Sequence, residues 1–354
     1  MPNALDLITL HNTAAYVQSR PTPLFLGDAL FPSEKVVGLQ VQWVMGYNDV
    51  PVLLKPSALG SRAFTRDRIG AKEIKMDLPF FREQMLLDER VRQQLQRLDA
   101  DLEDPYVTET IMRVFDDVNT LRVGAKAQVE RMRMQLLSSG TISVTGANKD
   151  GRDVAITYDY DQSGIWKKKN VRTLTGTQKW DNPETSTPIT DILDTVRVAS
   201  TEGVTLRRAI ISPKTFQKMA ASEQVKALFI VVGTSIVVPH SDAEVIDAVQ
   251  AKTGVRFTVY SDMYRDEDGK YHAYYPDDVV SFFPDGTLGT TTYGTTPEEA
   301  DLIATQNTTV SVVDTGVAIT QTREYGPPLV IKTIVSQLVL PRFPMMSSLY
   351  LLKV

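Results

Sequence analysis

The feature that most constrains the fold of this chain is one long amphipathic helix. Residues 105–137 carry apolar side chains at spacings of three or four, which places them on one stripe of an α-helix. Pro105 suits a first helical turn and Gly140 suits a stop. At 1.5 Å per residue the helix would be about 45 Å long. The stripe comprises Ile111, Phe115, Val118, Leu121, Ala125, Val129, Met132 and Leu136.

A rod of this length with one apolar face is typical of the backbone of a flat domain. Charged side chains are predicted to cover the rest of its surface, namely Glu109, Arg113, Asp117, Arg122, Lys126, Glu130 and Arg133. A coiled-coil dimer is the competing interpretation, although the spacing is not a strict heptad. The charged stretch from Pro79 to Arg97 is predicted to begin a helix of its own.

Two strands joined by a long connection precede the helices. Residues 35–45 and 71–78 alternate apolar and polar side chains, the period-two pattern of half-buried strands. Residues 46–70 between them are rich in turn-forming and charged residues. A compact monomer seldom keeps such a long connection without a function, and its edges could pair with another chain. We expect a protruding hairpin, against the alternative of a loosely held surface loop.

Residues 1–33 are interpreted as an N-terminal arm. A short helix is expected over residues 9–15, after which Pro21 and Pro23 favour an extended path. Apolar anchors follow at Phe25, Leu26, Leu30 and Phe31. Two placements of the arm stay open, one on its own domain and one on a neighbouring copy.

The chain after the long helix continues with shorter elements. Residues 141–160 predict a β-hairpin that turns at residues 148–151. Residues 182–301 alternate helices and strands, which favours an α/β domain around a central sheet. Residues 316–323 and 329–340 are strand-like, and residues 349–352 are a last apolar run. Beyond residue 295 the chain is expected to leave the α/β domain and rejoin the region of the long helix.

Composition narrows the classes of protein that the chain can represent. It has 354 residues, which suggests about two domains, and no cysteine, which excludes disulfides and thiolate metal sites. A net charge of −5 argues against a protein that wraps nucleic acid tightly. No apolar run is long enough for a membrane span, and residues 1–18 show no signal-peptide pattern, so no membrane partner is expected.

Motifs for catalysis are sparse. The three histidines, His11, His240 and His272, lie in unlike contexts, and neither a phosphate-binding loop nor a nucleophile elbow is present. The acidic run from Asp262 to Gly269 resembles part of a calcium loop, but a solvated hairpin turn is the favoured interpretation. We therefore expect no enzyme activity, no catalytic, cofactor-binding or metal-binding residues, and no cofactor.

The order of these parts resembles the lambda-type major capsid proteins of tailed bacteriophages. The resemblance rests on Phe31-Pro32 before the strand through Trp43, on the segment Val52-Leu53-Leu54-Lys55-Pro56, and on Gly60 before the strand at 71–78. The long helix, the following hairpin and the terminal strands also match. The pattern spans nearly the whole chain.

This resemblance implies an α+β fold of the Hong Kong 97 capsid type. It assigns residues 1–33 to an N-terminal arm, 34–80 to an extended loop over a neighbouring subunit, and 81–184 to a peripheral domain with a spine helix at about 105–137. Residues 185–300 become the axial domain, and 301–354 return strands that complete the peripheral domain. The expected function is a structural subunit of an icosahedral phage head, in the virion capsid and, before assembly, in the host cytoplasm.

The implied partners are further copies in hexamers and pentamers, a separate scaffolding protein, a portal, a decoration or cement protein, and enclosed double-stranded DNA bound without sequence specificity. Candidate intersubunit contacts are Phe25, Phe31, Trp43, Leu53, Leu54, Arg62, Arg66 and Arg68. Lys167, Lys168 and Lys169 could face DNA, although a solvated triplet is the commoner case. Two other functions stay open: an encapsulin-like protein compartment and a metal-dependent hydrolase using the region from Asp262 to Asp268.

Overall fold

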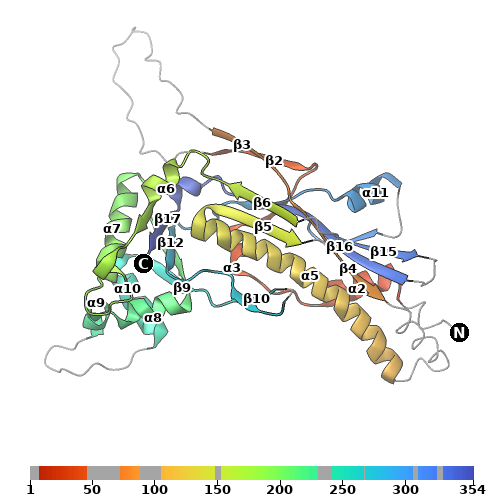
Figure 1. Cartoon of the computed structure of the whole chain (residues 1–354), viewed down its shortest axis with the longest axis horizontal. Coiled ribbons are helices and arrows are strands. Elements are labelled where there is room, and N and C mark those ends of the chain that lie inside the picture. Colours follow the sequence, from red (N-terminus) through yellow and green to blue (C-terminus); the bar gives the residue numbers. More distant parts are fainter. Residues whose placement is uncertain are drawn as a thin grey trace, which may run out of the picture. The chain divides into compact units, whose positions relative to one another are not determined.

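The structure is a computed structural model that describes residues 8–45, 72–87, 105–147, 153–229, 241–266, 268–305, 310–324 and 330–354 (Figure 1). The chain divides into two compact units, each made of three segments. Unit 1 comprises residues 1–42, 75–132 and 289–342, and unit 2 comprises residues 43–74, 133–288 and 343–354. The expected connection at 46–70 and the expected hairpin turn at 148–151 lie outside the described residues.

The predicted long helix is confirmed as α5, Pro105–Ser139. Gly140 ends it in the left-handed conformation, with φ at +72°, and its N–H donates to the Leu136 carbonyl at 2.9 Å. The prediction that charged residues lie on its exposed surface is wrong at three positions. Arg122, Glu130 and Arg133 are 4%, 0% and 1% exposed. Protein packs around more of this helix than a single stripe, so the polar positions are enclosed as well.

Unit 1 is built on a six-stranded sheet in the order β1-β13-β16-β15-β14, with β4 also paired to β16. Its strands are β1 Ser33–Lys35, β4 Phe80–Leu87, β13 Thr290–Tyr293, β14 Val310–Asp314, β15 Val317–Glu324 and β16 Val330–Arg342. The strands β15 and β16 confirm the predicted terminal strands. β1 runs parallel to β13, and the other pairs in this sheet are antiparallel.

Two predictions near the start of unit 1 are wrong. The helix expected from Pro79 is strand β4, because residues 80–87 pair with residues 331–338 of β16. The single strand expected over residues 35–45 is divided into β1 and β2, Gln40–Met45. Gly38 lies between them with φ at +123°, a conformation that interrupts a strand. Consequently Val37 is 92% exposed, whereas Val41 is buried.

Among the described residues, unit 1 also contains the helices α2 Leu10–Ser19, α3 Leu26–Leu30 and α11 Pro297–Thr305. The helix expected at residues 9–15 is confirmed as α2, which begins after Thr9; the Thr9 hydroxyl accepts a hydrogen bond from the Asn12 N–H at 3.2 Å. α3 is a turn of helix within the part expected to be extended. Leu10, Ala14 and Val17 of α2 pack with residues of α5, β14, β15 and β16 in one apolar cluster.

Unit 2 contains the expected α/β domain. Its five-stranded sheet has the order β7-β17-β12-β8-β9, with strands β7 Val171–Thr173, β8 Arg208–Ile211, β9 Arg256–Val259, β12 Val279–Phe283 and β17 Tyr350–Lys353. Helices α7 Pro188–Thr201, α8 Pro213–Ala221, α9 Glu223–Lys226 and α10 Asp242–Thr253 gather beside it (Figure 1). Strand β17 pairs with β7 and β12, so residues 350–353 belong to this sheet and not to the return strands with which they were grouped.

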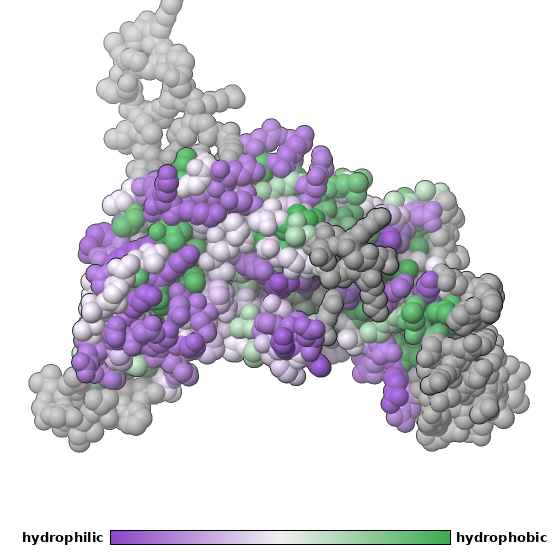
Figure 2. All heavy atoms as spheres, viewed as in Figure 1, coloured by the Kyte–Doolittle hydropathy of each residue, from purple (hydrophilic) through white to green (hydrophobic). Residues whose placement is uncertain are grey.

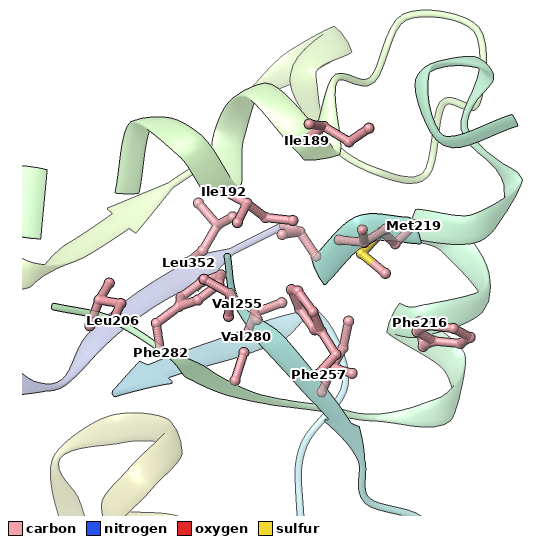
Figure 3. Packing of buried hydrophobic residues seen from close by; sticks show 14 of the residues in the cluster. Ile189, Ile192, Leu206, Phe216, Met219, Val255, Phe257, Val280, Phe282 and Leu352 are labelled. Carbon is pink, nitrogen blue, oxygen red and sulfur yellow. The ribbon is translucent and has the colours of Figure 1, made fainter. Parts of the chain in front are cut away.

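The core of unit 2 lies between these helices and one face of the sheet. Val280 and Phe282 from β12 meet Phe257 from β9, Leu352 from β17 and Ile192 from α7 (Figure 3). The opposite face carries Ser281, whose hydroxyl donates to the Leu137 carbonyl near the end of α5 at 2.7 Å. Because side chains alternate along β12, Phe282 packs under the helices while Ser281 contacts the end of α5 on the opposite face.

Local signals set the boundaries of the helices in unit 2. The Ser212 hydroxyl accepts the Thr215 N–H at the start of α8, and Ser241 and Glu244 form a capping box at the start of α10. Gly254 ends α10 with φ at +75°. A serine or threonine oxygen in this position satisfies an N–H group that has no partner within the helix.

The remaining elements are hairpins and short helices. The predicted hairpin after α5 is confirmed as β5 Thr141–Ala147 with β6 Asp153–Asp159. Two other two-stranded sheets are β2 with β3, Lys72–Asp77, and β10 Met263–Arg265 with β11 Tyr271–Ala273. The short helices are α6 Ile165–Asn170, η1 Gly176–Gln178, η2 Ala227–Phe229 and η3 Met346–Ser348.

Candidate assembly and nucleic-acid surfaces

The eight candidate intersubunit residues fall into two groups. Five of them lie outside the described residues, namely Leu53, Leu54, Arg62, Arg66 and Arg68. Of the other three, Phe31 is 0% exposed and Trp43 is 5% exposed, and the Trp43 ring lies 5.6 Å from that of Tyr160. Both side chains already pack within the chain, so direct contact with a neighbour would require the chain to open. Phe25 is half-buried at the start of α3.

The arm is fastened to unit 1 by a buried ion pair. Arg122 of α5 donates from Nε to Asp314 Oδ2 at 2.5 Å and from Nη2 to Asp314 Oδ1 at 3.0 Å. Its Nη1 also donates to the carbonyl of Val17, in the last turn of α2. The two side chains are 5% and 20% exposed. One guanidinium therefore joins α5, the β14–β15 turn and the end of α2.

Three further interactions help to hold the arm in place. The Tyr16 hydroxyl donates to Asp116 of α5 at 2.7 Å, and the guanidinium of Arg20 lies over the Tyr16 ring at 4.7 Å. Farther along, the Gly27 N–H in α3 donates to the buried Glu130 carboxylate at 3.0 Å. Of the two placements left open, the structure adopts the one in which residues 8–33 pack on their own unit.

The lysine triplet lies on α6, where all three side chains are exposed. Lys167 Nζ is 3.2 Å from an Asp159 carboxylate oxygen, and Lys169 Nζ is 2.5 Å from Glu202. No described carboxylate lies within ion-pair distance of Lys168. The positive charge that the triplet could offer to DNA is therefore largely balanced at two of its three positions.

The acidic run from Asp262 to Gly269 includes strand β10, and its described residues Asp266, Asp268 and Gly269 lie in the turn that follows the strand. Asp266 Oδ2 lies 2.7 Å from His272 Nε2, and Asp266 Oδ1 accepts the Lys270 N–H at 2.8 Å. These hydrogen bonds, the one to His272 first, hold the pKa of the Asp266 carboxyl below its usual value. Within the described ranges, no three histidine or carboxylate side chains converge as metal ligands would. The arrangement is that of a turn stabilised by its own side chains.

Several apolar side chains are exposed although the sequence did not predict it. Val37 and Leu39, expected inside a strand, are 92% and 61% exposed, and Phe80 at the start of β4 is 42% exposed under the guanidinium of Arg82. Gly38 was the one signal that could have identified the first two. On the face of the molecule in Figure 2, hydrophilic residues predominate over the helices of unit 2.

None of the described helices is long and apolar enough to cross a membrane. Solved structures share the fold. A prophage protein from E. coli CFT073, described as a capsid protein, has a TM-score of 0.60 and 18% identity, covering 98% of this chain and 99% of its own. A phage-related protein from Bordetella bronchiseptica RB50 has a TM-score of 0.53 and 12% identity, covering 98% and 97%. No curated protein sequence matches this chain at a significant level.

These matches define the class of fold as α+β and Hong Kong 97-like, as expected from the sequence. The model of one family, described as phage major capsid protein E, matches residues 9–315. The chain belongs to this family. It is therefore a structural component of the phage head that assembles with copies of itself, and not an enzyme, which overturns the hydrolase alternative.

Proposed function

We propose that this chain is the lambda-type subunit that tiles the icosahedral head of a tailed phage as hexamers and pentamers around double-stranded DNA. The observation that supports this most strongly is the family match over residues 9–315, which include most of both units. Many modest contacts between copies, repeated over a closed shell, add up to a large stability. A mildly acidic wall, at a net charge of −5, would enclose DNA without holding it.

We assign the parts of the chain to the layout that this function needs. Residues 1–33 would be the arm, 34–80 the extended loop over a neighbour, 81–184 and 301–342 the peripheral domain, and 185–300 the axial domain, to which residues 343–354 return. Strand β17 pairs with β7 and β12 of the α/β sheet, which supports the assignment of residues 343–354 to the axial domain. A separate scaffolding protein, a portal and a decoration or cement protein would complete the head.

Negative-stain electron microscopy of the purified protein, expressed alone and with its scaffolding protein, tests the proposal. We expect closed shells or rings of five and six subunits. A uniform monomer or dimer under both conditions would contradict it. Shells that contain protein cargo and no DNA, when recovered from infected cells, would favour the encapsulin-like alternative.

Deletion of residues 51–68, which lie outside the described residues, tests the extended loop. We expect the variant to remain a folded monomer with the helix content of the parent by circular dichroism, and to form no shells, because the loop would bury its surface on a neighbour. Loss of the cooperative unfolding transition would instead place these residues in the core of the subunit.

A smaller prediction concerns the candidate DNA-facing lysines. Because Lys167 and Lys169 are paired with carboxylates, we expect Lys168→Ala to weaken binding of unassembled protein to double-stranded DNA more than Lys167→Ala does. Loss of one phosphate contact would also lower the slope of log affinity against log salt by about 0.9. Fluorescence anisotropy across a salt series measures both quantities. Equal, unchanged slopes for the two variants would remove α6 from the DNA-facing surface.

A further inference from the structure

The β10–β11 hairpin of unit 2 presents two different faces. Residues that pair across an antiparallel ladder lie on the same face, and the register pairs Tyr264 with His272. On this face the two rings stack with centroids 5.4 Å apart, and Tyr264 also contacts the buried Tyr274 at 5.1 Å. On this face, therefore, Tyr264 and His272 both have their contacts within the chain, through the stacked rings and the Asp266–His272 hydrogen bond.

The other face is open. Met263 pairs with Ala273 and Arg265 pairs with Tyr271, so these four side chains share it. All four are exposed, Met263 by 55% and Tyr271 by 70%. Met, Tyr and Arg are residue types enriched in the cores of protein interfaces. The hairpin extends away from the helices of unit 2, and no other described strand pairs with either of its edges (Figure 1).

The charge on this open face is unbalanced. Arg265 is its only ionisable side chain apart from the weakly acidic Tyr271 hydroxyl, and no described carboxylate lies within ion-pair distance of the guanidinium. Its Nε donates to the Gly269 carbonyl at 3.3 Å, which leaves the positive charge itself unneutralised. An occupant of this face would therefore combine a flat surface for Met263 and Tyr271 with a carboxylate for Arg265.

The outer face of α10 has these properties. The helix buries Val245, Val249 and Thr253, and the 3.6-residue period places Ala243, Glu244, Asp247 and Ala251 on the opposite side, where all four are exposed. The two alanines leave room for larger side chains, and the two acids give the face a negative charge. No described cation lies within ion-pair distance of Asp247.

We propose that the open face of the β10–β11 hairpin docks on the outer face of α10 in a second copy of this chain. The contact joins two different surfaces, so it is head-to-tail, the type that closes into rings when the rotation between copies allows it. The inference rests on the proposed function, because that function supplies rings of five and six copies. It adds the residues through which neighbouring α/β domains would meet.

The absence of cysteine from the chain allows a direct test. The double variant Tyr271→Cys, Ala251→Cys places one thiol on each surface. In oxidised shells of this variant, we expect a ladder of disulfide-linked species up to five and six chains on a non-reducing gel. The matched control Tyr271→Cys, Arg197→Cys, with its second thiol on the exposed side of α7, should give no ladder.

Charge exchange provides a second measurement that does not depend on a disulfide. We expect Arg265→Glu and Asp247→Arg each to raise the protein concentration needed for half-maximal assembly at least fivefold, and the combination to restore it to within about twofold of the parent. Arg256→Glu, an equal charge reversal on the neighbouring strand β9, should leave assembly unchanged. Circular dichroism of each variant shows that it is folded.

The outcomes separate the inference from the proposed function. Shells that form without a ladder, with no rescue by charge exchange, would overturn the hairpin–α10 contact and leave the capsid function standing. Dimers from Tyr271→Cys alone would show that two hairpins meet face to face, which also overturns it. If the unmodified chain forms neither shells nor rings, with or without its scaffolding protein, the proposed function itself fails.

Discussion

The two units of this subunit are stabilised in different ways where they bury their helices. In unit 2 the helices α7, α8, α9 and α10 share one broad apolar cluster with the sheet. Polar groups there cap helix ends, and the buried Asp191 of α7 pairs with Arg172 at 3.0 Å. In unit 1 the helix α2 joins a much smaller apolar cluster. A buried ion pair, Arg122 with Asp314, supplements the apolar contacts at this place.

The difference follows from how much surface each helix can bury. Three side chains of α2, Leu10, Ala14 and Val17, enter the cluster. Arg122 adds to these apolar contacts by binding both Asp314 and the carbonyl of Val17 in the last turn of α2. The helix α2 therefore depends on a few polar atoms as well as on apolar contacts, whereas the helices of unit 2 depend mainly on buried apolar area.

The largest expected effect concerns the apolar core of unit 2. Phe282 is 0% exposed in the centre of the unit 2 core, with its ring edge-on to Phe257 at 6.1 Å. We expect Phe282→Ala to lower the free energy of unfolding of the unassembled protein by about 3–5 kcal/mol, because it removes a ring and leaves a cavity. Urea unfolding followed by circular dichroism measures this. Leu193→Ala on the exposed side of α7 is the control, and equal losses for both variants would contradict the placement of the core.

The next largest effect concerns the ion pair between Arg122 and Asp314 in unit 1. We expect Asp314→Ala to cost about 3 kcal/mol, because it leaves the Arg122 charge buried without its partner. Hydrogen exchange should rise first in α2. The double variant Arg122→Met, Asp314→Leu should recover only part of the stability, since it removes the unpaired charge but also the hydrogen bond from Arg122 to the Val17 carbonyl in α2.

Asp285→Ala is the matched control for this experiment. Asp285 is 73% exposed and lies 3.5 Å from Arg208, so its loss should cost about 0–1 kcal/mol. Equal effects of Asp314→Ala and Asp285→Ala, or a double variant as stable as the parent, would show that the buried pair does not hold α2.

The elements that could be predicted from the sequence are those decided by nearby residues. The helix α5 followed from one stripe and its end at Gly140, and α10 followed from Ser241 and Gly254. Strand β4 could not be predicted in the same way. Arg82, Glu83, Gln84, Met85 and Leu86 all favour helix, and only their pairing with β16, about 250 residues along the chain, makes them a strand.

The surfaces were harder to predict than the elements. The stripe on α5 gave no sign that Arg122, Glu130 and Arg133 are buried, because a helical pattern identifies one apolar face and not how many sides are covered. Period-two alternation placed Val37 inside a strand, although one left-handed glycine, Gly38, turns it to solvent. The family resemblance supplied the function, which no single motif in this chain carries. The five candidate contacts between Leu53 and Arg68 stay a prediction.

The smallest expected effect concerns the ion pairs of Lys218 at the surface of unit 2. Lys218 Nζ lies 2.6 Å from Asp181 and 2.5 Å from Asp278. Burial lowers the pKa of Lys218, but the hydrogen bonds to the two carboxylates outweigh it, so the pKa is raised overall. The pKa of Asp181 is lowered, first by its hydrogen bond from Lys218. Because these pairs are part-exposed, Lys218→Met should cost only about 0–1 kcal/mol at neutral pH.

The pH dependence of that cost distinguishes a charge effect from a packing effect. A raised lysine pKa contributes stability below the unfolded value of about 10.4 and loses it as the pH rises through the folded value. A lowered aspartate pKa contributes above about 3.9 and loses it as the pH falls through the folded value. The difference in unfolding free energy between the parent and Lys218→Met should therefore be flat near neutral pH and shrink at both extremes. Lys226→Met, which removes an exposed pair with Glu223, is the control. A difference that stays constant across the whole range would mean that Lys218 acts through its aliphatic chain, and that unit 2 relies on buried area even at its surface.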